Sequence, residues 1–179
     1  MDDDISDTLD NDEEQFILGE TKELFTCTGE DENQAVALSM IQQTEMHLDI
    51  LGHKLDLEIY DTEACCEAIE NLALLSRHSR IRILLRNIRQ VSQSGHLLIY
   101  LGKRLGSLLE FRELAMQYHS LSESFMLADN IGFMHREFKD SFKSTVNFCD
   151  GKNVKELSKL FNQLWEDSEP SPETQHLIV

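Results

Sequence analysis

A helix followed at once by a buried strand is encoded in residues 62–86, TEACCEAIENLALLSRHSRIRILLR. The first part of this stretch carries apolar residues at the i, i+3, i+4, i+7 spacing of an amphipathic helix, namely Cys65, Ala68, Ile69, Leu72 and Leu75. Residues 80–86 are short and rich in isoleucine and leucine, which predicts a mostly buried strand. A helix packed against the strand that follows it is the repeating unit of layered α/β proteins.

The flanking sequence continues this alternation. The patterns predict strands at 47–52, 108–114, 124–128, 133–136 and 145–148, and helices at about 33–45, 94–105 and 152–167. Two hairpins are predicted as well, one from 124–128 and 133–136 around a polar turn and one from 16–18 and 24–27. Strands that alternate with helices and then run together before a last helix predict an α/β fold, with a mixed β-sheet flanked by helices.

Length and local composition predict the domain organisation. The chain has 179 residues, which favours one domain. Residues 1–14 hold eight acidic residues and few apolar ones, so we expect a disordered acidic head before a single domain at residues 15–179. No apolar run approaches the ~18–20 residues that cross a bilayer, and the start lacks the pattern of a signal peptide. We therefore expect a cytoplasmic protein with no membrane association.

The charge of the chain reverses locally. The formal net charge is −17, which excludes a general nucleic-acid coat. Residues 76–112, however, hold eight Lys and Arg residues against Glu110 alone. We expect an anion-binding rim here, which is also the only place where nucleic acid could bind, and the alternative is that these cations are solvated or paired with the acidic surplus. The candidate rim residues are Arg86, His96, Arg104 and Arg112.

The cysteines and histidines give no sign of a metal site. The chain has four cysteines without a C-x-x-C pair, at positions Cys27, Cys65, Cys66 and Cys149. Structural zinc needs Cys and His ligands at clustered spacing, and no such cluster is present in the sequence. We therefore expect reduced thiols, no metal and no cofactor.

Several short motifs, in order, resemble one half of a phospholipase D-like domain between His47 and Asp167. More narrowly, they resemble a bacterial family of compact, uncharacterised phospholipase D-like proteins. The motifs that carry the resemblance are Ser79–Leu84, Gly95–Leu98, Glu110–Arg112, Phe125–Asp129 and Trp165–Ser168. The resemblance implies a phospholipase D-like half-domain in which a His-x-Lys-x4-Asp motif performs phosphodiester chemistry.

That motif is degenerate in this chain. If Asp129 is matched to the aspartate of the motif, Ser122 stands at the histidine and Ser124 at the lysine. A serine without a base is a weak nucleophile and carries no charge for phosphate oxygens. If the motif is instead aligned from His119, Leu121 stands at the lysine position, so the cation of the motif is still missing.

The sequence therefore leads to a non-catalytic phospholipase D-like module that binds a phosphate-containing ligand, a nucleic-acid end or a partner protein. One alternative is a structural or protein-interaction domain without a ligand. Another is an enzyme with a rearranged phosphoryl-transfer site built on His96 or His119. Because the superfamily usually pairs two such halves around one site, we also expect a homodimer.

Overall fold

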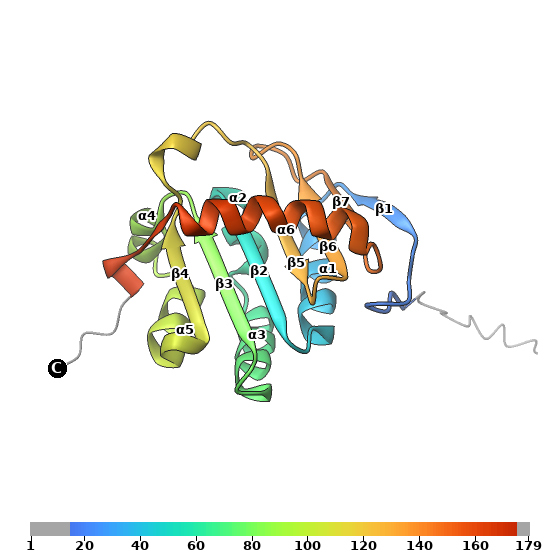
Figure 1. Ribbon diagram of the computed structural model, residues 1–179, viewed down its shortest axis with the longest axis horizontal. Helices are drawn as coiled ribbons and strands as arrows, with labels where there is room; N and C mark the ends of the chain where they lie inside the picture. Colours follow the sequence, from blue (N-terminus) through green and yellow to red (C-terminus); the bar gives the residue numbers. More distant parts are fainter. Residues whose placement is uncertain (1–14, 175–179) are drawn as a thin grey trace, which may run out of the picture.

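The computed structural model describes residues 15–174 and contains one eight-stranded sheet with the order β1-β7-β6-β5-β2-β3-β4-β8 (Figure 1). β2, β3 and β4 are parallel neighbours, and the remaining pairs are antiparallel. The strands are β1 Leu24–Cys27, β2 His47–Gly52, β3 Arg80–Leu85, β4 Leu109–Glu113, β5 Ser124–Ala128, β6 Gly132–Arg136, β7 Ser144–Asn147 and β8 Glu169–Pro170. The expected α/β fold with a mixed sheet is confirmed.

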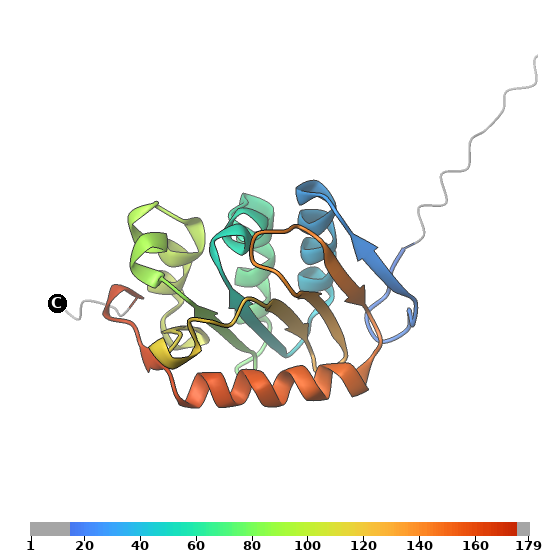
Figure 2. The ribbon, with the colours of Figure 1, turned by 90° about the horizontal axis from the view of Figure 1, so that it is seen from above.

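Helices cover both faces of the sheet. Figure 2, seen from above, shows α1 to α5 on one side of the strands and α6 running alone along the other. The helices are α1 Glu30–Gln43, α2 Lys54–Tyr60, α3 Glu63–Leu75, α4 Ile88–Gln93, α5 Leu97–Leu105 and α6 Gly151–Glu166, with short 3-10 turns at Gly106–Leu108, Met116–Tyr118 and Pro172–Thr174.

Side-chain caps start four of these helices, including α5, where His96 accepts from the Leu98 N–H. Thr62 accepts a hydrogen bond from the Cys65 backbone N–H at the start of α3, and Asn87 accepts one from Gln90 at the start of α4. Asp150 does the same at the start of α6. Such caps satisfy backbone N–H groups that the first turn of a helix leaves without partners.

Each face of the sheet carries its own apolar core because successive side chains on a strand point to opposite faces. On β3, Ile83 packs toward the layer of five helices, whereas the next residue, Leu84, packs beneath α6. The larger core lies under α1–α5, and the smaller one contains Phe161 and Trp165 of α6. Trp165 is 4% exposed, as the apolar face of the predicted last helix requires.

Two sequence-based predictions of local structure are wrong. Residues 16–18 are not a strand, because the Ile17 carbonyl accepts bonds from the N–H groups of Glu20 and Thr21 in a turn that includes Gly19 at φ +87°. β1 therefore pairs with β7 and forms no hairpin with residues 16–18. The helix predicted at 94–105 begins at Leu97, because Gly95 at φ +76° separates it from α4.

Two further features complete the fold. The short helices α2 and α4 were not predicted, and both follow directly after a parallel strand. The acidic head at residues 1–14 lies outside the described residues, so its disorder stays a prediction. Within residues 15–174, no helix is both long and apolar enough to cross a membrane.

Candidate functional site

Four strands bring chemistry-bearing residues to one edge of the sheet. The parallel strands β2 and β3 end together at Gly52 and Leu85, which are register partners. β5 runs antiparallel to β2, so it begins at this same edge with Ser124. β6 ends there with Arg136, the register partner of Ser124. Ligands of open α/β sheets favour the crevice beyond the carboxyl ends of the parallel strands.

The residues that the sequence aligned with the His-x-Lys-x4-Asp motif are divided between the two ends of β5. Ser122 lies just before the strand, and its Oγ donates to the Glu137 carbonyl at 3.1 Å. Asp129 lies after the strand, at the opposite edge, where its carboxylate accepts bonds from the backbone N–H groups of Glu45, Met46 and His47 at 2.7–2.8 Å. Asp129 therefore ties the loop between α1 and β2 to the end of β5.

Ser124 belongs to a buried polar cluster beneath the edge. Its Oγ–H donates to Asp56 Oδ1 at 2.9 Å, and Arg136 forms an ion pair with the same oxygen. The backbone N–H of His53 donates to the other carboxylate oxygen at 2.5 Å. Burial raises the pKa of the Asp56 carboxyl group, while Arg136 and these donors favour its ionised form. Ser124, which the sequence placed at the lysine position of the motif, thus contributes a hydrogen bond to a buried ion pair.

His53 follows β2 directly and is 5% exposed. Its Nε2 lies 3.0 Å from the Glu123 carbonyl, which only accepts, so Nε2 carries the proton of the neutral ring. Burial lowers the pKa of His53; Arg86 and Lys139 also lower it, whereas Asp56 and the Glu123 carbonyl oppose the shift. Its Nδ1 is buried and has no hydrogen-bond partner among the described residues.

An open pocket of ≈ 690 Å³ lies at this edge. His53, Arg86 and Asn87 contribute to its lining from the ends of β2 and β3, and Lys139 contributes from the loop between β6 and β7. Arg86 and Lys139 form no ion pair with a carboxylate in the described part of the chain. The pocket volume falls in the range of small-molecule sites, roughly 300–1,000 Å³.

The four cations predicted to form one rim are divided among different surfaces. Arg86 and His96 both line the pocket, but His96 Nδ1 accepts a bond from the Leu98 N–H at the start of α5. Arg104, on α5, forms a surface ion pair with Glu70 of α3 at 2.6 Å. Arg112 lies on the α6 face of the sheet, against Trp165.

Arg112 serves packing on the α6 face. Its guanidinium carbon lies 4.5 Å from the centroid of the Trp165 ring, and its Nη1 donates to the carbonyls of Trp165 and Ser168. Because the preceding residue, Phe111, packs under α5 instead, the alternation of β4 puts Arg112 on the face away from His96. The prediction that Arg112 shares a rim with Arg86 and His96 is therefore wrong in geometry, and Arg104 lies outside the lining of the pocket.

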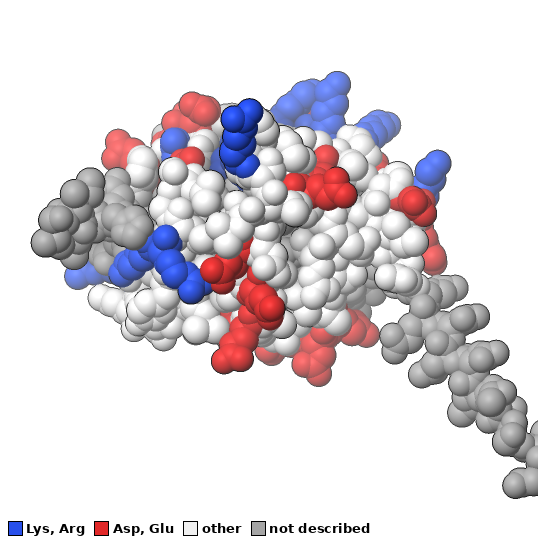
Figure 3. Space-filling view, turned by 90° about the horizontal axis from the view of Figure 1, so that it is seen from below, with Lys and Arg blue, Asp and Glu red and all other residues white. Residues whose placement is uncertain are grey.

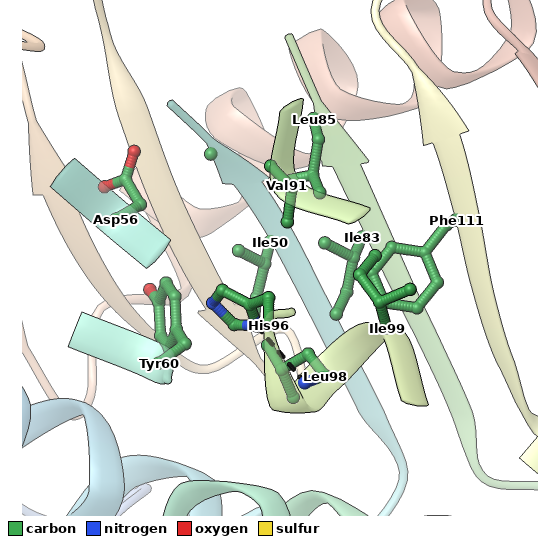
Figure 4. Close-up of a pocket in the computed structure, with 11 residues that line it drawn as sticks. Ile50, Asp56, Tyr60, Ile83, Leu85, Val91, His96, Leu98, Ile99 and Phe111 are labelled. Carbon is green, nitrogen blue, oxygen red and sulfur yellow. Dashed lines mark hydrogen bonds between the residues drawn. The ribbon is translucent and has the colours of Figure 1, made fainter. Parts of the chain in front are cut away.

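A smaller cavity lies next to the pocket, between α2, α5 and the sheet. Figure 4 shows Asp56, Tyr60 and His96 on one side of it, facing the aliphatic side chains of β2 and β3. Its volume of ≈ 10 Å³ matches about one water molecule, so it cannot hold a larger ligand. Burial raises the pKa of Tyr60 well above its ordinary value, so this phenol stays protonated.

No group of three His, Cys, Asp or Glu residues among the described positions could hold a metal ion. Sequence reasoning also missed residues that the structure brings to the site. His53 carried a usable signal, because it follows a predicted strand just as Arg86 does. Lys139 lies in a loop whose path no local pattern predicts, and the partnership of Asp56 with Arg136 spans 80 positions.

Residues 29–177 match the family described as "Domain of unknown function (DUF7931)". The chain belongs to this DUF7931 family. No curated protein sequence matches it. The family match covers the sheet from β2 to β8 and all six helices, so the pocket lies wholly within the DUF7931 domain.

Solved structures show which fold the DUF7931 domain shares. It is similar to the phospholipase D family member Nuc from Salmonella typhimurium, with TM-score 0.56, 12% identity and coverage of 83% of this chain and 99% of Nuc. It is also similar to NucT from Helicobacter pylori, with TM-score 0.60, 12% identity and coverage of 83% of this chain and 100% of NucT. TrmBL2, an archaeal chromatin protein, is similar with TM-score 0.60 and 15% identity over 84% of this chain. The match covers 55% of TrmBL2, so the chain spans about half of that protein. The phospholipase D-like fold is thereby confirmed.

Proposed function

We propose that this DUF7931 domain is a phospholipase D-like module without phosphodiesterase activity, which binds a phosphate-containing ligand at the carboxyl edge of β2 and β3. The observation that carries the proposal is that the residues at the motif positions are buried or already bonded, whereas an open pocket with cations lies beside them. Ser124 is engaged by the buried Asp56–Arg136 pair, whereas Arg86 and Lys139 of the neighbouring pocket have no carboxylate partner among the described residues.

The motif positions lack the groups that phosphodiester chemistry needs. A nucleophile and a fixed cation must reach the same phosphorus, and serine supplies neither unless a base activates it. Ser124 is 1% exposed and Arg136 is 3% exposed, so the nearest buried cation also cannot reach a ligand in the pocket. This supports a module that binds rather than hydrolyses.

The pocket supplies what anion binding needs. A guanidinium offers a planar fork of donors to phosphate oxygens, and an ammonium adds a mobile point charge. Arg86 and Lys139 both lie near enough to His53 to act on its pKa, which supports their converging at one end of the pocket.

Calorimetric titration of the full chain with inorganic phosphate at low salt tests the binding. We expect binding that weakens as salt rises. We also expect Arg86→Ala and Lys139→Ala each to lower the affinity for phosphate about tenfold or more, the equivalent of one charge-assisted hydrogen bond. Arg104→Ala is the matched control, because it removes an exposed arginine outside the pocket and is expected to leave affinity unchanged. Absence of binding by the wild-type chain would refute the anion site.

Turnover of a chromogenic phosphodiester tests the second half of the proposal. We expect none above the uncatalysed rate. Turnover that disappears in His53→Gln but not in Arg104→Ala would instead favour an enzyme with a rearranged histidine site, since the buried Nδ1 of His53 has no partner in the part of the chain that the structure describes.

A further inference from the structure

The pocket combines two kinds of charge. Besides Arg86 and Lys139, three carboxylates line it, Glu58, Asp61 and Asp140. The lining therefore carries a net charge of −1, from two cations and three carboxylates. An ionised carboxylate only accepts hydrogen bonds and repels phosphate. A ligand that fits this lining must bring donors of its own as well as an anion.

The cations and one of the carboxylates occupy different parts of the pocket. Arg86 and Lys139 both lie near enough to His53, at the end of β2, to lower its pKa. Asp61 lies instead at the start of α5, where its Oδ1 accepts from the Leu97 N–H at 2.9 Å. Glu58 lies one turn before Asp61, on α2, and its side chain forms no ion pair in the described part of the chain. Asp140 directly follows Lys139 and also lines the pocket, so the two cations share their end with one carboxylate, whereas Glu58 and Asp61 form a wall of hydrogen-bond acceptors.

Neutral polar groups extend this wall. Gln90 on α4 also lines the pocket, and its side-chain amide offers a donor and an acceptor. Hydroxyl groups match such a lining because each can donate to a carboxylate and accept from an amide. The same lining disfavours a polynucleotide, whose successive phosphates would face the carboxylates.

The outer surface gives no alternative for a polyanion on the side opposite the pocket. Figure 3 views the molecule from that edge and shows Lys and Arg in separate groups, interspersed with Asp and Glu and with uncharged surface. A strand of nucleic acid needs a continuous basic groove along its backbone.

From these observations we infer that the ligand is a small phosphate monoester that carries hydroxyl groups, such as a sugar phosphate, with its phosphate on Arg86 and Lys139 and its hydroxyls on Glu58 and the acceptor wall. The inference rests on the proposed function of the pocket. It adds that the carboxylates select the ligand, rather than merely solvating the rim.

A panel of probes separates the two ends of the pocket. The full chain is titrated with inorganic phosphate, methyl phosphate, glycerol 3-phosphate, ribose 5-phosphate and glucose 6-phosphate. We expect at least one hydroxylated ester to bind about tenfold more tightly than methyl phosphate, the gain from one hydrogen bond to a charged group. Glucose without phosphate, and a single-stranded 20-mer at equal phosphate concentration, are expected to bind more weakly than that ester.

Glu58→Ala gives a change of opposite sign for the two ligand types. Removing this carboxylate takes away repulsion, so methyl phosphate is expected to bind more tightly, whereas the hydroxylated ester loses an acceptor and is expected to bind about tenfold more weakly. Glu67→Ala is the matched control, since Glu67 is an exposed glutamate of α3 that lines a different groove. It is expected to change neither affinity.

The outcomes distinguish this inference from the function on which it rests. Binding of phosphate and methyl phosphate, with no hydroxylated ester tighter than methyl phosphate, overturns the ligand class and leaves the anion site standing. Parallel weakening or strengthening of both ligand types in Glu58→Ala also overturns it. Failure of every probe to bind, inorganic phosphate included, overturns the anion site itself, and preference for the 20-mer replaces the sugar phosphate with a nucleic-acid end.

Discussion

Replacing Arg136 by methionine tests how much the buried Asp56–Arg136 ion pair beneath Ser124 contributes to the free energy of unfolding. Asp56 is 4% exposed and Arg136 is 3% exposed, so the substitution leaves a carboxylate in the core without its cation. Removing one partner of a buried pair costs about 3–5 kcal/mol. With a urea m-value of about 2 kcal/mol per molar, a loss of about 4 kcal/mol moves the unfolding midpoint by about 2 M.

The loss is expected to depend on pH. Without Arg136, burial outweighs the two remaining donors, the His53 N–H and the Ser124 hydroxyl, and holds the pKa of Asp56 above that of the unfolded chain, about 3.9. The folded variant then takes up a proton more readily than the unfolded one, so the loss shrinks as pH falls from 7 toward that raised pKa. Urea titrations followed by the fluorescence of Trp165 at pH 7 and pH 5 measure both effects.

Two further variants make the result interpretable. Arg104→Met breaks an ion pair whose arginine side chain is 63% exposed, and it is expected to change stability by less than about 1 kcal/mol. The double variant Asp56→Asn/Arg136→Met removes both charges and is expected to recover more than half of the loss, which keeps the test usable if the single variant does not fold. A loss in Arg136→Met below about 1 kcal/mol, or one that is equal at pH 7 and pH 5, would refute the reasoning.

Four other outcomes follow from particular residues. Gly102→Ala places a Cβ 2.5 Å from Phe111 Cε2, so thermal melts are expected to show a loss of about 1–3 kcal/mol, in contrast to a gain at a free helix site. Burial, together with Arg86 and Lys139, lowers the pKa of His53 despite the opposing effect of Asp56, so stability is expected to fall as pH drops below about 6.5, and His53→Gln should flatten that slope. Deleting residues 1–14 is expected to leave the melting temperature nearly unchanged, and a drop of many degrees would contradict a disordered head. Sedimentation at tens of micromolar is expected to show a homodimer, and a monomer there would refute the pairing (roughly the range where weak dimers persist).

Local patterns in the sequence determined the layered fold. The helix at 63–75 was recognisable from its apolar period of 3.6, and the strand at 80–85 from a short run rich in isoleucine and leucine, both of which are local properties of the chain. The short helices α2 and α4 have six or seven residues, which is too few for a period to emerge. The turn at residues 17–21 was missed because Gly19 can adopt a positive φ that no apolar pattern reports.

The tertiary structure alone decided which cations share a site. Charge counting along residues 76–112 could not separate Arg86 from Arg112, since both lie on or just after a parallel strand. The pleat turns Arg112 toward α6, while the end of β3 leaves Arg86 at the pocket. Lys139 joins Arg86 from a loop more than fifty positions later, because the order of strands in the sheet, and not their order in the chain, sets which ends are neighbours. The sequence by itself determined the longer helices and most of the strands; only the folded sheet determined which charges meet.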